Sequence, residues 1–278
     1  MTKVMHKLGL GANNQVPAQA INDLEQDGVI CLREAFSAQW LEVIEHGIDL
    51  ALNGASTDVD IVKRASDEGS FSFSSGAWRE VEPFKKFIFE SQLADIAWTL
   101  LDTKSLVLFY DFLLIKQPRS DNAATPWHQD HSYYPLDGTK VINCWVALDE
   151  IPVESALSFL PGSHQPGKLY RAVDFENPQK DYSHVRRDLP LPPLSNDDIA
   201  TDIVTCPMSP GDMLVWKSYT LHSAPGNKLD RRRAALSVSW LGDDIVYKDV
   251  PSLETYRDPS LVPGQPMNCE KFPQVRSG

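Results

Sequence analysis

The sequence predicts a mainly β protein with flanking helices. After Thr103, short runs rich in β-branched and aromatic residues alternate with Pro, Gly, Asn and Asp turns. Before that point, several segments repeat apolar residues at helical spacing. The 278 residues, 42% hydrophobic and 23% charged, are typical of a globular protein that can bury a large core. We therefore expect N-terminal helices beside a barrel or jelly roll.

The first predicted elements are a helix, a strand and a second helix. Residues 17–27 form a short amphipathic segment that Gly28 should end, and residues 29–36 read as a strand. Ser37 is expected to cap the second helix, whose apolar stripe runs to Gly54.

Residues 55–80 are rich in Ser, Gly and Asp, and we expect them to form a long loop. Phe71, Phe73 and Arg79 could make this loop a lid that excludes water, and a disordered insertion is equally compatible with the composition. Pro83 then marks the start of one or two further helices.

The remaining elements are expected to be strands. We divide residues 1–278 into one domain with a helical part at about 17–103, a β core at about 104–245 and a tail at 246–278. Within the core, residues 171–200 read as a polar, proline-punctuated insertion. The predicted strand runs are "SLVLFYDFLLIKQP", "KVINCWVALDEIP", "SALSFLPGSH", "IVTCPMSPGDMLVWKSYTLHSAPGN" and "RAALSVSWLG".

Charge and composition argue against several classes of protein. The net charge of -12 repels phosphate backbones and anionic lipid, so we expect no nucleic-acid partner. No apolar run reaches the roughly 18 to 20 residues of a membrane span. The four cysteines lie far apart without metal-site or disulfide spacing, which is typical of a reducing cytosol and predicts a cytoplasmic protein.

A histidine and an aspartate two residues apart suggest a metal site in "TPWHQDHSYYP". Such a pair is expected about once by chance in this composition, so its context must support it. On a strand, His128 and Asp130 would project from the same face. His222, at the end of another predicted strand, is the best third ligand, and two histidines with one carboxylate are a typical Fe(II) site with open positions.

An arginine on the following strand suggests a co-substrate. Arg233 shares a face with small residues, which leaves room beside a buried cation, whereas Arg231 and Arg232 are expected to be solvated. A buried guanidinium needs an anion, and a dicarboxylate would meet it in bidentate form. Trp145, on the strand "KVINCWVALD", could flank the same cofactor.

Each of these residues also has an ordinary structural interpretation. The His128 and Asp130 pair could be a surface ion pair, and His222 a hydrogen-bonded loop histidine. Arg233 could be a surface residue, and Trp145 a core tryptophan that is at the same time a cofactor wall. Tyrosines after the metal motif could line a substrate pocket or simply pack.

Several motifs together resemble the phytanoyl-CoA dioxygenase family of Fe(II)/2-oxoglutarate oxygenases. They occur in one order over roughly residues 20–245: "WHQD", "NCWVALDEIP", "LPGSHQPG", "SPGDMLVWKSYTLHSAPGN" and "RRRAALSVSW". The resemblance implies a double-stranded β-helix, a jelly-roll and cupin-like core. It also implies Fe(II), 2-oxoglutarate as co-substrate and O2.

The resemblance assigns roles to particular residues of this chain. It implies metal ligation by His128, Asp130 and His222 and 2-oxoglutarate binding by Arg233, eleven residues after the distal histidine, with Trp145 and Thr125 as further cofactor contacts. Asp130 separates the chain from family halogenases, which carry a small residue there. Ser155 departs from the glycine that relatives usually have.

The sequence therefore predicts an Fe(II)/2-oxoglutarate-dependent dioxygenase that hydroxylates a small metabolite, a natural product or an acyl thioester, releasing succinate and CO2. The sequence does not distinguish hydroxylation from desaturation or cyclisation of the substrate. It also does not indicate an oligomeric state. One alternative is a cupin-like isomerase or hydrolase using Zn or Mn, which would have no use for a buried arginine. Another is a non-catalytic metabolite-binding module, which 2-oxoglutarate turnover would distinguish.

Overall fold

The computed structural model describes residues 3–57, 59–62, 68–165, 168–175, 188–193 and 202–278. Within them the fold is mostly β, with four α-helices: α1 (Ala18–Asp27), α2 (Ala38–Leu50), α3 (Glu82–Glu90) and α4 (Leu93–Leu101). None of the helices in the described ranges has the length and apolar character needed to cross a bilayer.

The strands among the described residues form two principal sheets and one small one, with mostly antiparallel and two parallel pairings. The major sheet has the order β2 (Lys7–Gly9), β3 (Val29–Arg33), β12 (Met213–Lys217), β9 (Val141–Ala147), β14 (Arg233–Leu241), β6 (Ser105–Lys116), β5 (Phe71–Ser75) and β4 (Val59–Val62), with β16 (Gln274–Ser277) also on β6. The minor sheet has the order β1 (Lys3–Val4), β11 (Val204–Thr205), β10 (Ser158–Phe159), β13 (His222–Ala224) and β7 (Thr125–His128). Strands β8 (Leu136–Asp137) and β15 (Val246–Tyr247) pair separately.

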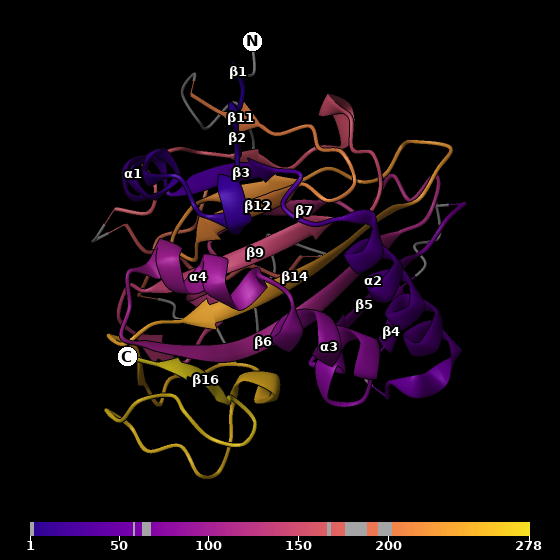
Figure 1. Ribbon diagram of the computed structural model, residues 1–278. Helices are drawn as coiled ribbons and strands as arrows, with labels where there is room; N and C mark the ends of the chain where they lie inside the picture. The colour runs from indigo at the N-terminus through magenta and orange to yellow at the C-terminus, as the bar shows by residue number, and fades with distance from the viewer. Residues whose placement is uncertain (1–2, 58, 63–67, 166–167, 176–187, 194–201) are drawn as a thin grey trace.

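The helices and the two sheets pack as layers (Figure 1). The helices cover the outer face of the major sheet, where their apolar side chains share one core with residues such as Leu236, Val238 and Trp240. The inner face meets the minor sheet in a second core, in which Trp145 and Ala235 lie with Phe159 of β10. This two-sheet arrangement is the predicted jelly roll rather than a closed barrel.

The N-terminal elements follow local rules that the sequence displays. Gly28 adopts a left-handed φ of 77° and ends α1 by donating its N–H to the carbonyl of Leu24. Ser37 occupies the cap position of α2, although its side chain makes no capping bond. Pro83 lies in the first turn of α3, where a missing N–H is harmless.

The expectation of a loop over residues 55–80 is wrong for the part that the structure describes. Strands β4 and β5 form an antiparallel pair, and β5 extends the major sheet by pairing with β6. In "FSFSS", serine alternates with phenylalanine, and Ser72 and Ser74 face the buried side, so the polar composition concealed a period of two. Residues 58 and 63–67 of the predicted lid lie outside the described residues.

The C-terminal segment, yellow in Figure 1, lies against the β6 side of the major sheet. Strand β16 pairs with β6, and Met267 and Phe272 pack with Phe109 in a third core. Most of the predicted insertion at 171–200 falls on residues 176–187 and 194–201, outside the described residues.

Candidate metal centre

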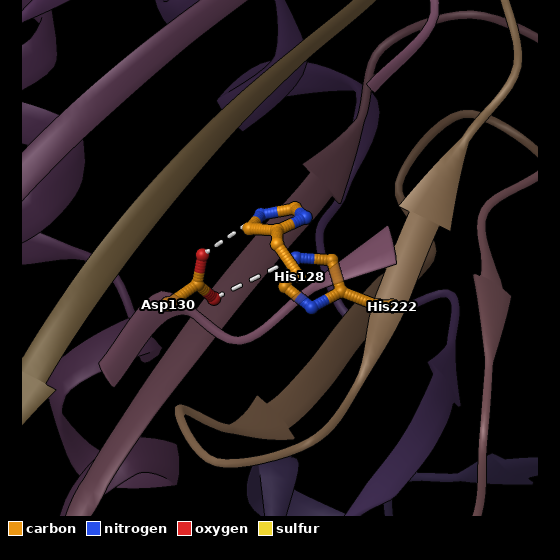
Figure 2. Close-up of side chains that lie close together, drawn as sticks. All are labelled: His128, Asp130 and His222. Atoms are coloured by element: carbon orange, nitrogen blue, oxygen red, sulfur yellow. Dashed lines mark ion pairs between the residues drawn. The ribbon is translucent and has the colours of Figure 1, made fainter. Parts of the chain in front are cut away.

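Three potential ligands from two separate segments of the sequence meet at the edge of the minor sheet (Figure 2). His128 ends β7 and His222 begins β13, and the two residues are direct partners in the antiparallel ladder. Asp130 projects toward both rings, and one ligand atom from each residue lies within 4.8 Å of the others. No other such cluster of His, Cys, Asp or Glu occurs among the described residues.

The backbone between the first two ligands differs from the expected continuous strand. Strand β7 stops at His128, and Asp130 begins a 3-10 turn, Asp130–Tyr133. The turn carries the carboxylate back toward both rings, with Oδ1 at 3.4 Å from His128 Nε2 and Oδ2 at 3.6 Å from His222 Nε2. The spacing thus brings the side chains together through a turn, not through the alternation of a strand.

Backbone carbonyls select the tautomer of both histidines. His128 Nδ1 lies 2.9 Å from the carbonyl oxygen of Pro126, and His222 Nδ1 lies 3.0 Å from that of Thr220. A carbonyl can only accept, so each Nδ1 must carry the proton. Each Nε2 then presents a lone pair toward Asp130, which is the form that binds a metal.

The Asp130 carboxylate is oriented by two donors on the same oxygen. Asn143 Nδ2 donates to Oδ2 at 2.7 Å, and Trp216 Nε1 donates to it at 2.8 Å. Asn143 in turn accepts a hydrogen bond from the hydroxyl of Ser239 on the neighbouring strand. These contacts occupy Oδ2 and leave Oδ1 as the less encumbered ligand atom.

Sequence reasoning assigned no role to Trp216 or Asn143. The available signal was weak, because Trp216 lies six residues before His222 in a run that reads as an ordinary buried strand. Asn143 shares a face with Trp145, but a polar residue in an apolar strand does not reveal its partner.

Burial and charge keep Asp130 and His222 in their ligand forms. Burial raises the pKa of the Asp130 carboxyl, but His222, His128 and the bond from Trp216 outweigh it and hold the pKa below its ordinary value. Burial lowers the pKa of His222 to about 4. Around neutral pH His222 therefore offers a neutral imidazole and Asp130 an ionised carboxylate.

Arg233 is a buried cation on the inner face of the major sheet. It is 5% exposed, and its Nη1 donates to the carbonyl oxygens of Ser155 at 2.8 Å and Pro225 at 3.3 Å. It makes no ion pair with a carboxylate in the described part of the chain. Burial lowers the pKa of its guanidinium to about 10, because the neutral carbonyls only partly replace the water that the charge loses.

The other predicted cofactor contacts lie close to this region. Trp145 is 2% exposed and packs in the inner core between the sheets. Thr125 begins β7, where it pairs with Ala224 and is half-buried.

The expectation that Arg232 is solvated is wrong. Its guanidinium contacts Glu45 of α2 through Nη2 at 2.5 Å and Asp149 through Nε at 3.0 Å. Asp149 also accepts a bond from the Ala234 N–H at 2.7 Å. Arg232 therefore secures the start of β14, next to Arg233, against α2 on the outer face of the major sheet.

Cross-strand register gives the inner face a regular layout. Along β14 the inward residues are Arg233, Ala235, Ser237 and Ser239, and directly opposite them on β6 lie Lys116, Leu114, Phe112 and Tyr110. On the other side of β14, Asn143, Trp145 and Ala147 of β9 face Ser239, Ser237 and Ala235. Small residues of β14 therefore form the middle of this inner face, and larger side chains of β6 and β9 flank them.

Aromatic residues of β5 and β6 form one side of this inner face: Phe71, Phe73, Phe112 and Tyr110. We call these four residues the aromatic strip. Successive ring centroids in this order lie 5.3, 5.9 and 6.4 Å apart. These four side chains are half-buried, whereas the outward residues of the same strands, such as Leu113, are buried beneath the helices.

The tyrosines that follow the metal motif have different surroundings. Tyr133 and Phe175 both pack on the His128 ring, with centroids at 6.0 and 4.7 Å, and Phe175 is 40% exposed. Tyr134 is buried, and its hydroxyl lies 2.5 Å from that of Tyr110. Phe175 was not recognised from the sequence, because it lies in the polar segment.

Comparison with known proteins identifies a family for this chain. Residues 24–235 match the model of the family described as phytanoyl-CoA dioxygenase (PhyH). A phytanoyl-CoA dioxygenase of Arabidopsis thaliana is 26% identical over 60% of this chain and 56% of its own length. A probable phytanoyl-CoA dioxygenase of Caenorhabditis elegans is 26% identical over 51% of this chain and 45% of its own. The chain thus spans about half the length of the curated relatives it matches.

Solved structures share the fold at low sequence identity. The non-heme alpha ketoglutarate dependent carbocyclase SnoK from nogalamycin biosynthesis has a TM-score of 0.73 at 22% identity, covering 94% of this chain and 96% of its own. The epimerase SnoN, in complex with Fe3+, alpha ketoglutarate and nogalamycin RO, has a TM-score of 0.70 at 22% identity, covering 93% and 98%. EctD from S. alaskensis, with 2-oxoglutarate and 5-hydroxyectoine, has a TM-score of 0.68 at 19% identity, covering 96% and 90%.

Proposed function

Because the chain belongs to the phytanoyl-CoA dioxygenase family, we propose that it is an Fe(II)/2-oxoglutarate-dependent dioxygenase that hydroxylates a small-molecule substrate. The observation that carries this proposal is the convergence of His128, Asp130 and His222, together with the buried guanidinium of Arg233, which contacts the carbonyl of Pro225 three residues after His222. We also propose that the chain acts as one domain, since β3 and β16, from its two ends, lie in the same sheet.

The donor set fits ferrous iron. Two imidazole Nε2 atoms and one carboxylate oxygen are ligands that suit Fe(II) and leave open coordination positions. The carbonyl contacts to both Nδ1 atoms and the two donors on Asp130 Oδ2 orient these ligands before any metal arrives. Iron with 2-oxoglutarate would supply the activation of O2.

Arg233 fits the distal carboxylate of 2-oxoglutarate. A buried guanidinium held only by neutral carbonyls is costly, and a carboxylate would form charge-assisted bonds with it. On the same face of β14 as Arg233, the small residues Ala235, Ser237 and Ser239 take up little of the volume that a co-substrate would need. A Zn or Mn isomerase or hydrolase built on the same fold has no comparable need for this cation.

The aromatic strip supports an apolar or planar substrate. Its side chains remain half-buried although they lie on the inner face, and Tyr110 connects to Asp130 through Ser239 and Asn143. Substrate packed there would displace water from aromatic surface close to the metal ligands. The protein's own contribution is to position this molecule and to keep bulk water away.

A cytoplasmic location is also part of the proposal. All four cysteines are free thiols, and three of them, Cys31, Cys144 and Cys206, are buried. Free thiols of this kind are typical of a reducing compartment.

Anaerobic titration tests the proposed function directly. Fe(II) and 2-oxoglutarate together should produce a metal-to-ligand absorption band, and admission of air with substrate should release succinate. Asp130→Ala should abolish the band and the succinate. If the purified protein binds neither Fe(II) nor 2-oxoglutarate, or if Asp130→Ala turns over like the parent, the proposal fails.

A further inference from the structure

Residues 168–175, which we call the strap, are held by the side chain that lies between the first two metal ligands in the sequence. Gln129 is 1% exposed. Its Nε2 donates to the carbonyl oxygens of Lys168 at 2.7 Å and Tyr219 at 2.6 Å, and its Oε1 accepts the N–H of Tyr170 at 2.9 Å. Tyr219 lies in the segment that leads to the third ligand. One buried amide therefore ties the strap to both segments that supply ligands.

Further contacts fix the rest of the strap on the turn that carries the ligand carboxylate. Ser132 Oγ donates to the carbonyl oxygen of Tyr170 at 2.7 Å. The Tyr133 hydroxyl donates to the carbonyl oxygen of Val173 at 2.8 Å and accepts its N–H at 3.0 Å. Ala172 and Val173 are also buried. The end of the strap therefore has a defined position relative to the metal ligands.

Phe175, the last residue of the strap, lies against a metal ligand. Its ring centroid is 4.7 Å from that of His128, with the ring planes at 64°, and 5.6 Å from that of Tyr133. His128 is 4% exposed, whereas Phe175 is 40% exposed. An apolar ring that is held in place and still meets water has surface to offer a ligand.

The other ligand histidine has different surroundings. His222 packs against Phe159, with ring centroids 5.7 Å apart, and against Trp216, with centroids 5.1 Å apart. Both of these aromatic side chains are buried. Among the described residues, the exposed aromatic surface that contacts a ligand ring is therefore that of Phe175. A molecule that approaches the metal from solvent is expected to pass beside it.

We propose that Phe175 forms a wall of the substrate site and selects a substrate with a flat apolar ring. The inference rests on the proposed function and names the substrate class of that site. The aromatic strip approaches the same ligands from the major sheet, where Tyr110 is linked to Asp130 through hydrogen-bonded neighbours. A flat substrate meets rings from both the strap and the sheet, in the edge-to-face or offset arrangements that aromatic pairs prefer.

The test measures where an aromatic probe binds, without turnover. Parent, Phe175→Ala and Phe175→Tyr proteins are loaded with Mn(II) and 2-oxoglutarate and titrated with 2-naphthol. Mn(II) speeds the proton relaxation of the probe only when the probe binds close to the metal. Phe89→Ala is the matched control, because Phe89 is 36% exposed and contacts Trp78 on the helical side of the molecule. Decahydro-2-naphthol, which has the same carbon skeleton without the flat ring, is titrated in parallel.

The parent should speed the relaxation of 2-naphthol and should bind decahydro-2-naphthol more weakly. Phe175→Ala should weaken the binding of 2-naphthol roughly tenfold, because it removes one aromatic contact and the apolar area around it. Phe175→Tyr and Phe89→Ala should bind the probe like the parent. The affinity of Phe175→Ala for Mn(II) should match that of the parent, because Phe175 supplies no ligand atom.

Several outcomes would overturn the inference. If Phe175→Ala binds 2-naphthol beside Mn(II) as tightly as the parent, the phenyl ring is not a wall of the site. If this variant loses Mn(II) affinity together with the probe, the ring only supports His128. If the parent binds Mn(II) and 2-oxoglutarate but not 2-naphthol, or binds both naphthols equally, the substrate class is wrong while the proposed function stands. If the parent binds neither metal nor 2-oxoglutarate, the proposed function fails and the inference fails with it.

Discussion

The orientation of Asp130 should depend on one indole N–H. Trp216 Nε1 donates to Asp130 Oδ2 at 2.8 Å, and its ring packs against Phe159 and His222 with centroid distances of 5.6 and 5.1 Å. Trp216→Phe removes the N–H and keeps an aromatic ring in that place. A hydrogen bond to a charged group contributes roughly 1.5 to 3 kcal/mol, which sets the size of the expected loss.

That loss should appear in metal affinity. With Asn143 as the one donor left to it among the described residues, the carboxylate can rotate more freely, so part of the binding energy is spent on orienting it. The free-energy range above corresponds to roughly a ten- to hundredfold weaker metal affinity. Anaerobic calorimetric titration with Fe(II), repeated with Mn(II), measures this constant without any co-substrate.

Trp240→Phe is the matched control. Trp240 is fully buried in the outer core, and its Nε1 finds no hydrogen-bond acceptor among the described residues. The same change there costs packing and thermal stability but should leave the metal constant unchanged. Equal Fe(II) affinities for parent and Trp216→Phe, with both proteins folded, would refute the argument that this N–H prepares the ligand.

Three further outcomes follow from other residues. Burial raises the pKa of Asp111 from 3.8 to about 7, so the folded chain retains a proton that the unfolded chain has lost, and stability falls as pH rises between these values. Relative to the parent, Asp111→Asn should therefore gain roughly 4 kcal/mol from pH 4 to pH 8 in denaturant titrations, and parallel profiles would contradict this. Asn227→Ala removes three Nδ2 bonds to main-chain carbonyls and should cost roughly 2 to 4 kcal/mol of unfolding free energy and weaken 2-oxoglutarate binding; a stable variant with full affinity would show that Asn227 does not hold the start of β14 in place. Phe112→Ala should raise the KM for the primary substrate with little change in the 2-oxoglutarate constant, and an effect confined to 2-oxoglutarate would remove the aromatic strip from substrate binding.

Much of the architecture could be predicted because its signals are local. Gly28, Pro83 and the apolar runs after Thr103 each determine structure within a few residues of themselves. The ligand histidines could be proposed for a similar reason, since each lies at a strand terminus next to a turn: His128 is the last residue of β7 and His222 the first of β13. Predicting the jelly roll and the convergence of His128, Asp130 and His222 also required the order of several motifs along the chain.

The features that the sequence did not predict depend on contacts between distant segments. The serines of β5 look like loop residues until β6 lies beside them, and Arg232 looks solvated until Asp149 and Glu45 are placed around it. In the same way, nothing within β12 indicates that the Trp216 indole meets a carboxylate from the turn that follows β7. Such residues keep the composition of ordinary strands and helices, and only the fold gives them partners.

Register is the physical quantity on which the whole site depends. Because side chains alternate along a strand, a shift of β14 by one residue would turn Arg233 away from Lys116 and Ser239 away from Asn143. The Arg232 contacts to Glu45 and Asp149 secure one end of β14, where Asp149 also binds the Ala234 N–H. These contacts lie on the face away from the metal ligands, so substitutions there should impair co-substrate binding through strand position alone. Arg232, Glu45 and Asp149, which lie away from the metal ligands, therefore help to align Arg233 and Lys116 with the metal site.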